Sequence, residues 1–251
     1  MSRVYIGTSG WSYKGWEKTF YPEDVPRKDQ FQFYATQFPT VEINLTFYRL
    51  PTLPMVRGWR EKAPPGFVYA VKGSRFITHM KKLVNLQGAL KKYFDRLKPL
   101  RQQTGAVLWQ LPPMLHYDPE RLDRFLGRLP GTYRHAVEFR HPSWLTTETG
   151  EILRRHETAF VSVSSLAMPA DMRVTTDFVY IRFHGLEGGA AHDYTEAELR
   201  PWAEHIHNQA RRGRAVYAYF NNDANVRAPA NARTLMDMAG ARAALATLAG
   251  L

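Results

Sequence analysis

Eight short apolar stretches, most of them separated by helical patterns, constrain the fold of this chain more than any other feature of its sequence. They are VYIGTSG from Val4, VEINL from Val41, VYAVK from Val68, AVLWQ from Ala106, AVEFR from Ala136, FVSVS from Phe160, FVYIRFH from Phe178 and AVYAYFN from Ala215. Strands that alternate with helices form parallel sheets, and eight such units close naturally into a barrel. We therefore predict an α/β fold of the TIM-type (β/α)8 class. An open doubly wound sheet is the alternative, although no GxGxxG motif follows the first strand.

Helical patterns occupy most of the connections between these stretches. Apolar stripes at helical spacing begin at Phe31, Leu83 and Trp202, and the alanine-rich segment 228–248 is helix-prone. Residues 165–177, between the sixth and seventh stretches, show no such stripe. We therefore expect the sixth crossover to be a loop or a single short turn.

Length and charge narrow the classes of protein that this chain can belong to. Its 251 residues suit a single barrel domain over 1–251, and it contains no cysteine, which excludes disulfides and thiolate chemistry. The chain starts directly in strand-like sequence and has no long apolar run, so we expect a cytoplasmic protein without a membrane span. Lys and Arg total 34 against 23 acidic residues, a formal charge of +11 that favours anionic partners.

Charged residues interrupt the predicted strands in a regular way. Side chains alternate between the two faces of a strand, and in a barrel the face opposite the helices looks inward. The polar face carries Glu42, Asn44, Lys72, Gln110, Glu138, Arg140, Ser162, Ser164, Arg182, His184, Tyr217, Tyr219 and Asn221. These residues are densest toward the carboxyl ends of the strands, where barrel enzymes place their chemistry. The sequence therefore predicts a polar, cationic pocket at this rim.

The side-chain types suggest roles within the predicted pocket. Glu138 and Glu42 are candidate acid–base or orienting groups, and Lys72 is a third candidate catalytic group. Lys72 also joins Arg140 and Arg182 as a candidate anion clamp. The remaining candidate ligand-binding residues are Asn44, Gln110, His141, His184, Asn221, Trp11 and Tyr13. A closed ion network without a ligand is the alternative, and Glu138 and Lys72 on opposite sides of the sheet would refute the pocket.

Seven motifs, in order, resemble a known family. They are YIGTSGWSYKGW with FYP, VEINLTFYRLP, FVYAVKGSRFITH, LWQLPP, VEFRHPSW, YIRFHG and YAYFNND, running from about Ile6 to Asp223. In these motifs the chain is similar to the YecE-like family, domain of unknown function 72. The resemblance implies a TIM-type barrel similar to that of apurinic endonucleases and sugar isomerases, and with it a suggested connection to nucleic acid. It implies no established reaction, and a shared fold is weak evidence about chemistry.

Three reactions can be weighed against the predicted pocket. Glu42, Glu138, His141 and His184 are potential metal ligands, but neighbouring cations repel a metal, so we predict neither a metal site nor a cofactor. Glycoside cleavage by the two glutamates is disfavoured, because three cations would keep both ionised. A Schiff-base role for Lys72 needs a depressed pKa, whereas a nearby carboxylate is expected to raise it, which favours a simple anion ligand.

Loops after the first three strands interleave aromatic residues with cations. This composition is typical of single-strand binding, where rings stack on bases and cations hold phosphates. The predicted partners are therefore an anionic small molecule or a nucleic acid. Our leading hypothesis is a site for a phosphate-bearing or other anionic ligand, without a decision on catalysis. The alternatives are a non-catalytic nucleic-acid-binding module and a small-molecule isomerase or lyase acting on a sugar or carboxylate.

Overall fold

The strands of the computed structural model, which describes residues 4–241, close into a barrel in the order β1 to β8. Every neighbouring pair is parallel, including β1 with β8, which closes the barrel. The strands are β1 (Val4–Ser9), β2 (Thr40–Ile43), β3 (Val68–Lys72), β4 (Thr104–Gln110), β5 (His135–Glu138), β6 (Thr158–Ser165), β7 (Phe178–Gly185) and β8 (Ala215–Phe220). The predicted TIM-type barrel is therefore confirmed.

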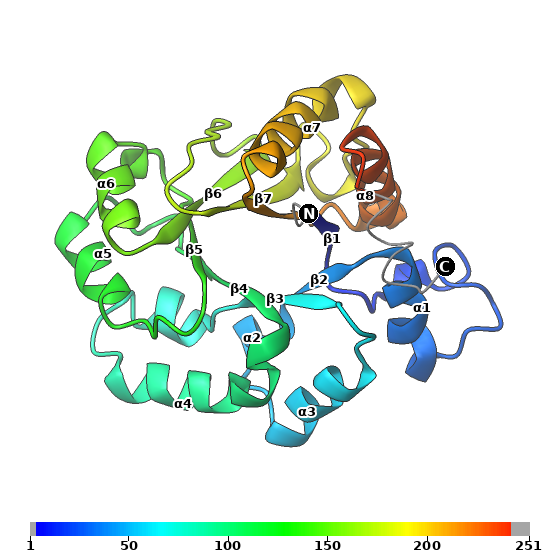
Figure 1. The fold of residues 1–251 in the computed structure, drawn as a ribbon, viewed down its shortest axis with the longest axis horizontal. Coiled ribbons are helices and arrows are strands. Elements are labelled where there is room, and N and C mark those ends of the chain that lie inside the picture. The colour runs from blue at the N-terminus through cyan, green and yellow to red at the C-terminus, as the bar shows by residue number, and fades with distance from the viewer. Residues whose placement is uncertain (1–3, 242–251) are drawn as a thin grey trace.

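Helices surround the strands on the outside of the barrel (Figure 1). The α-helices are α1 (Gln30–Gln37), α2 (Leu45–Tyr48), α3 (Leu53–Lys62), α4 (Gln87–Leu97), α5 (Pro119–Leu126), α6 (Thr147–Arg155), α7 (Glu196–Arg211) and α8 (Arg227–Met238). A π-helix, η3 (Phe76–Met80), follows β3, and there are short 3-10 segments η1 (Lys14–Trp16), η2 (Arg27–Asp29), η4 (Lys98–Gln103), η5 (Pro142–Trp144), η6 (Gly189–Ala191) and η7 (Ala224–Val226). Of the predicted helical segment 228–248, residues 242–248 lie outside the described residues.

The sixth crossover contains no helix, as its lack of an apolar stripe predicted. Residues 166–177 connect β6 to β7 in irregular structure. The helical stripe predicted from Leu83 was placed too early, because α4 begins at Gln87. Leu83 has a φ of 66°, in the left-handed region, which excludes it from the helix.

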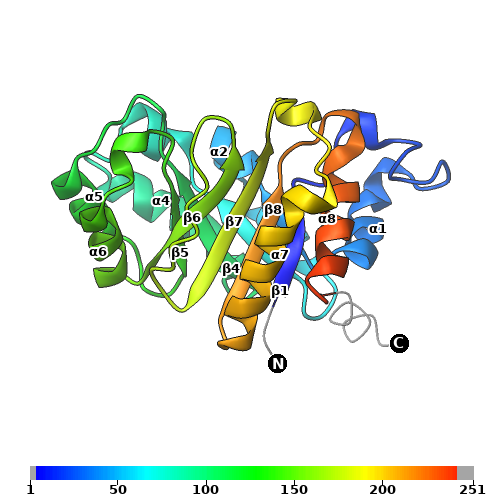
Figure 2. The ribbon, with the colours of Figure 1, turned by 90° about the horizontal axis from the view of Figure 1, so that it is seen from above.

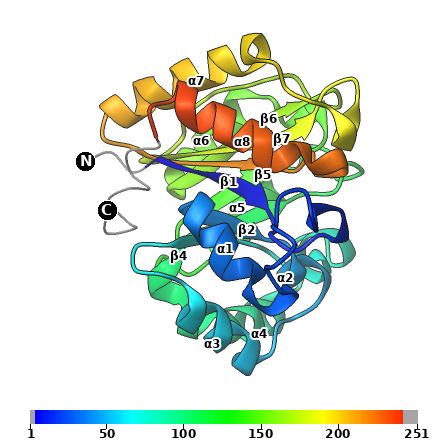
Figure 3. The ribbon, with the colours of Figure 1, turned by 90° about the vertical axis from the view of Figure 1, so that its right-hand side faces the viewer.

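Two apolar clusters separate the inside of the barrel from its outside. The outer cluster packs the strands against the helices; in Figure 2, for example, α7 and α8 run alongside β8 and β1. Figure 3 shows α8 and α1 on opposite sides of β1. The inner cluster fills the barrel and consists of Ala70, Ala106, Leu108, Ala136, Ala159, Val161, Val163, Met168, Phe178, Tyr180, Ala215, Tyr217 and Tyr219. Polar strand residues therefore occupy only part of the interior.

The predicted inward face is wrong for one strand. In β6 it is Val161 and Val163 that belong to the inner cluster, so Ser162 and Ser164 lie on the outer face. The Ser164 hydroxyl accepts a hydrogen bond from the Tyr194 hydroxyl at 2.9 Å, and Tyr194 belongs to the outer cluster. Tyr194 thus satisfies the Ser164 hydroxyl, whereas Ser162 Oγ is buried without a hydrogen-bond partner.

None of the helices in residues 4–241 combines the length and the apolar character that a membrane span requires.

Candidate functional site

Arg182 joins two carboxylates in the interior of the barrel, near the carboxyl ends of the strands. Its Nη2 donates to Glu42 Oε1 at 2.7 Å and its Nη1 to Glu138 Oε2 at 2.6 Å. All three side chains are at most 1% exposed. They come from β2, β5 and β7, so only closure of the barrel brings them together. Fully buried charges persist only when paired and hydrogen-bonded, which this arrangement achieves.

Glu138 collects further donors from neighbouring strands. Its Oε1 accepts from Gln110 Nε2 at 2.9 Å and from Arg140 Nη1 at 3.0 Å, and His184 Nε2 lies 3.0 Å away. Asn221 Nδ2 in turn lies 3.4 Å from His184 Nδ1. Four predicted site residues thus contact the Glu138 carboxylate: Gln110, Arg140, Arg182 and His184. Asn221, a fifth, lies behind His184.

Glu42 is held by two hydroxyls that the list of candidate site residues does not include. Ser9 Oγ donates to its Oε1 and the Tyr180 hydroxyl to its Oε2, both at 2.7 Å. Ser9 ends β1, beside Glu42 in the β1–β2 register. Tyr180 lies on the inward face of β7, two residues before Arg182. The available signal was a polar residue at the end of a strand. Ser9 has this position in β1 but is not among the candidate residues.

These contacts fix the protonation of both carboxylates. Burial alone would raise the pKa of Glu138, but Arg182, His184 and Arg140 hold it well below its ordinary value of 4.5. Burial likewise opposes ionisation of Glu42, and Arg182 and Lys72 outweigh it, so its pKa is also lowered. Both groups are therefore carboxylates at neutral pH. A proton-donating role, which the sequence disfavoured, is incompatible with this state.

Lys72 ends β3 inside the same barrel but takes no part in the paired charges. The residue is 8% exposed, and in residues 4–241 no carboxylate lies within 4.0 Å of its ammonium. Burial lowers its pKa to about 8, and Arg182 contributes in the same direction against Glu138 and Glu42. Glu138 and Glu42 do raise this pKa, as expected, but burial and Arg182 outweigh them, so the net shift is downward.

The other candidate residues lie around this centre without bonding to it. Tyr13 donates its hydroxyl proton to the Ser9 carbonyl oxygen, and the Trp11 ring packs edge-on against Phe31 at 5.3 Å. His141 stacks on His116, with ring centroids 4.0 Å apart. Asn44 lies past the end of β2, as the residue before α2, and its Oδ1 is buried without a hydrogen-bond partner.

Two residues beside Lys72 were absent from the candidate list. The Lys72 Nζ lies 4.3 Å from the centroid of the Phe47 ring, and the His79 ring contacts the same phenyl ring at 5.0 Å and 86°. His79 belongs to the π-helix η3, a rare conformation that often marks functional positions. Burial, Lys72 and Arg140 lower the pKa of His79, so its imidazole is neutral at pH 7. The sequence placed His79 in a loop and gave no sign of the π-helix.

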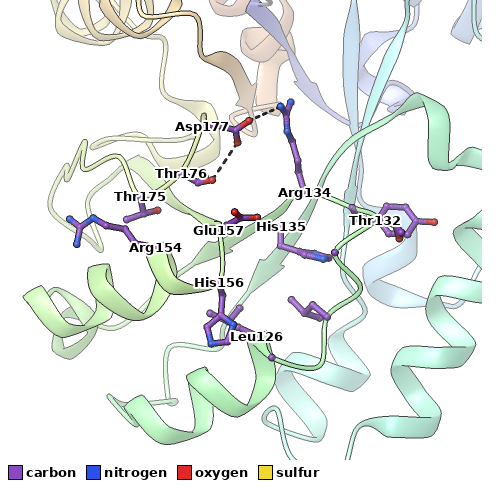
Figure 4. A pocket seen from close by; sticks show the side chains of 14 residues that line it. Leu126, Thr132, Arg134, His135, Arg154, His156, Glu157, Thr175, Thr176 and Asp177 are labelled. Carbon is purple, nitrogen blue, oxygen red and sulfur yellow. Dashed lines mark hydrogen bonds and ion pairs between the residues drawn. The ribbon is translucent and has the colours of Figure 1, made fainter.

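A hollow lies at the end of the barrel opposite the rim centre. A pocket of about 760 Å³ opens where β5, β6 and β7 begin, and its lining includes Arg134, His135, His156 and Asp177 (Figure 4). Arg134 pairs with Asp177 at 2.9 Å, and His156 pairs with Asp123 at 2.9 Å. At this end of such barrels side chains serve mainly stability, and these pairs fit that role.

Within residues 4–241, no group of three or more His, Asp and Glu side chains has an arrangement suited to a metal ion. The ligand-type residues that the sequence singled out are instead divided between ion pairs and ring stacking, as His184 and His141 show.

A closed parallel barrel of eight strands with surrounding helices defines a TIM-type barrel protein. More specifically, residues 5–249 match the family described as "Protein of unknown function DUF72", and the chain belongs to this family.

Relatives from several bacteria support this assignment. A DUF72 family protein from Thermotoga maritima has a crystal structure that is similar to this barrel with a TM-score of 0.86 and 31% identity, covering 94% of this chain and 98% of that one. An Enterococcus faecalis V583 member has a TM-score of 0.80 at 17% identity, a likeness of fold alone. UPF0759 protein YecE of Escherichia coli K12 is 31% identical over 144 residues, which cover 56% of this chain and half of YecE. UPF0759 protein YunF of Bacillus subtilis 168 is 23% identical over 94% of both chains.

Proposed function

We propose that the rim centre of this protein binds an anionic ligand, one that carries a phosphate or a carboxylate group. The observation that supports this proposal is the charge balance of the centre. Lys72, Arg140 and Arg182 carry three positive charges against the two carboxylates of Glu42 and Glu138, which leaves an excess of one. A buried charge without a partner is costly, and an anion bound beside it offsets that cost.

Two of the cations are available to such a ligand. Lys72 contacts no described carboxylate, as shown above. Arg140 is 30% exposed, and within residues 4–241 only its Nη1 makes hydrogen-bond contacts, which leaves Nε and Nη2 for a ligand. A guanidinium with two unused donors suits bidentate binding of a carboxylate or phosphate. Arg182, by contrast, is committed to both glutamates.

Thermal unfolding in phosphate tests the proposal. Inorganic phosphate or pyrophosphate should raise the Tm relative to chloride at the same ionic strength, since a ligand at one hundred times its Kd adds about 2.7 kcal/mol to stability. Lys72→Met and Arg140→Gln should each abolish most of this increase. Lys92→Gln, on the exposed face of α4, is the matched control and should retain it. Equal phosphate effects in all four proteins would refute the site.

A second candidate function, binding of single-stranded nucleic acid, has its own support. All six large apolar side chains that are exposed in the described part of the chain follow strands β2, β3, β4 or β6. They therefore lie at the same end of the barrel as the rim centre, and they are Tyr48, Phe76, Met80, Val84, Met114 and Leu166. Cations accompany two of them: the Arg75 guanidinium lies 5.8 Å from the Tyr48 ring and the Lys81 ammonium 5.7 Å from the Phe76 ring. Exposed rings with neighbouring cations suit base stacking and phosphate contact.

Fluorescence anisotropy with a labelled single-stranded oligonucleotide separates this candidate from the first. Binding should weaken steeply with salt, because phosphate contacts release counterions. Tyr48→Ala and Phe76→Ala should each reduce the affinity about tenfold, from about 1–3 kcal/mol of stacking, whereas Lys92→Ala on α4 should change it little. A salt-independent affinity, or no binding at low salt, would remove the candidate.

A further inference from the structure

Lys72 differs from every other charged residue of the rim centre in its surroundings. Glu42, Glu138 and Arg182 are bonded to one another, whereas the ammonium of Lys72 faces the Phe47 ring at 4.3 Å. Lys72 retains 8% exposure, and its Nζ is not sealed from solvent. Solvent therefore reaches the amine. A small ligand at the rim therefore meets an amine that no carboxylate covers.

Backbone contacts fix the end of β3 at Lys72. The Lys72 carbonyl oxygen accepts hydrogen bonds from Thr46 Oγ1 at 2.6 Å and from the Tyr93 hydroxyl at 3.1 Å. The next residue, Gly73, donates its N–H to the Leu108 carbonyl oxygen at 2.7 Å, which ties the strand end to β4. The Lys72 side chain therefore extends from a fixed point of the barrel, and its Nζ lies over the Phe47 ring.

The charges that face Lys72 come from several elements. They are Arg182 of β7, Glu42 of β2, Glu138 of β5, Arg140 after β5 and His79 of η3. Burial has the largest effect and lowers the pKa of the amine, and Arg182 and Arg140 act in the same direction. Glu138 and Glu42 oppose the shift, and the resulting pKa is about 8. The Phe47 ring face favours the ammonium form, but a substantial fraction of the amine is unprotonated at pH 7 to 8.

We propose that Lys72 is a nucleophile that forms an imine with the carbonyl group of an anionic aldehyde or 2-oxo acid, and that His79 accepts the proton that the amine releases. This inference rests on the proposed anion binding, since Arg140 is assigned to the phosphate or carboxylate of the same ligand. Buried lysines act in this way elsewhere because desolvation exposes the lone pair of the amine. His79 contacts the same Phe47 ring as Lys72. Its Nδ1 lies 2.9 Å from Thr78 Oγ1, and when Nδ1–H donates to this hydroxyl the neutral imidazole keeps the lone pair of Nε2 for the proton.

The reaction needs no co-reactant beyond the ligand. The nitrogen lone pair of Lys72 attacks the carbonyl carbon, and the C=O π electrons move to oxygen, which takes up a proton. That proton comes from water. One N–H proton passes to His79, which returns it to the hydroxyl group, so the C–O bond breaks and water leaves. The nitrogen lone pair forms the C=N bond of a protonated imine, and the one proton taken up from water balances its positive charge.

Reductive trapping tests the inference on the intact protein. Pyridoxal 5′-phosphate, a phosphate-bearing aldehyde, and glyoxylate, a carboxylate-bearing one, are each added with cyanoborohydride, which reduces an imine to a stable secondary amine. Peptide mass mapping should place the adduct on Lys72 at least tenfold faster than on the exposed Lys92. The aldehyde that labels Lys72 faster shows whether the site prefers a phosphate or a carboxylate group. The pH profile of Lys72 labelling should have its midpoint near 8.

Variants connect the label to the assigned residues. Lys72→Arg should abolish the adduct, and His79→Gln should slow its formation at least tenfold while leaving the thermal shift in phosphate unchanged. Phosphate stabilisation without selective labelling of Lys72 would overturn the imine while leaving anion binding in place. Absence of both would overturn the proposed function itself. Equal labelling of Lys72 and Lys92 would also overturn the inference.

Discussion

Arg182 is the residue on which the charges of the rim depend. It is 1% exposed and bridges two carboxylates that are themselves fully buried. Burying one ion costs several kcal/mol, and only mutual bonding offsets that cost. The Nη1 and Nη2 groups of Arg182 bind Glu138 and Glu42, and Lys72 pairs with neither carboxylate. The ligand proposal follows from this pairing.

Removal of one carboxylate charge should destabilise the protein strongly. Glu138→Gln leaves Arg182 and Arg140 partly uncompensated, so we expect the free energy of unfolding at pH 7 to fall by about 3 kcal/mol in urea titrations. Glu120→Gln, an exposed member of an i,i+4 pair, is the matched control and should have no measurable effect.

The same variant has a defined pH dependence. Because the pKa of Glu138 is well below 4.5 in the folded state, its stabilisation is complete above the unfolded-state pKa and is lost as the pH falls through the folded-state value. The difference between wild type and Glu138→Gln should therefore shrink below about pH 4.5. A difference that stays constant down to pH 2.5 would contradict the assigned ion pairs.

Lys72→Met should stabilise the protein at neutral pH, in contrast to Glu138→Gln. The amine has a folded-state pKa of about 8 and an ordinary value of 10.5, so the unfolded chain binds more protons between these limits and stability rises with pH there. Below pH 8 the variant should be more stable than wild type by up to about 3 kcal/mol. Urea titrations at pH 7 and 10.5 should show this advantage disappear. Equal stability at both values would mean that Lys72 has a normal pKa.

The identity of these residues was predictable from the sequence, but their states were not. Alternation along β5 correctly sent Glu138 and Arg140 inward and Val137 and Phe139 toward the helices. The pKa of Lys72 depends on its burial and on the charges around it, including Arg182. Neither the burial nor these distances can be read from the sequence. Glu138 was a candidate acid–base or orienting group, and the sequence did not show that Gln110, Arg140, Arg182 and His184 would all contact its carboxylate.

At the scale of elements, the ends of β3 and β4 are joined more tightly than their sequences suggest. A Cβ atom on Gly73 would lie 2.3 Å from Trp109 Cε3, and Trp109 is fully buried. Glycine at this position therefore lets β3 pass the indole and sets where Lys72 points. The π-helix η3 follows directly, so the same junction also positions His79.

Paired glycine substitutions test this junction. Gly73→Ala should lower the free energy of unfolding by about 1–3 kcal/mol, because the overpacked side chain must displace the indole. Gly88→Ala is the matched control: nothing lies within 4 Å of the added Cβ in α4, so alanine should stabilise the protein by about 0.5–1 kcal/mol. Chemical denaturation measures both. A neutral Gly73→Ala would show that Trp109 moves aside at little cost.

At the scale of the whole molecule, charge and topology act together. The chain carries a formal charge of +11, so its folded form experiences net self-repulsion. At the rim, Arg182 pairs with Glu42 and Glu138, and at the opposite end Arg134 pairs with Asp177. These pairs leave the net positive charge of the chain in place.

Salt should stabilise this protein in a manner that depends on pH. Raising sodium chloride from about 10 mM to 0.5 M shortens the Debye length from about 30 Å to well below 10 Å, so at pH 7 the Tm should rise. Near the isoelectric point of about 9.9 the same change should have little effect. Differential scanning calorimetry at both pH values provides the comparison, and a larger increase at the isoelectric point would contradict an origin in net charge.

The sequence by itself determined the barrel, the order of its strands, the helix-free sixth crossover and the inward direction of Glu42, Lys72, Glu138 and Arg182. Periodicity encodes these properties, because a strand alternates every two residues and a helix repeats every 3.6 residues. Only the tertiary structure decided which charges pair, that Ser162 and Ser164 face outward, and that Lys72 and His79 share one phenyl ring. Such properties depend on distances between different strands, and those distances exist only once the barrel has closed.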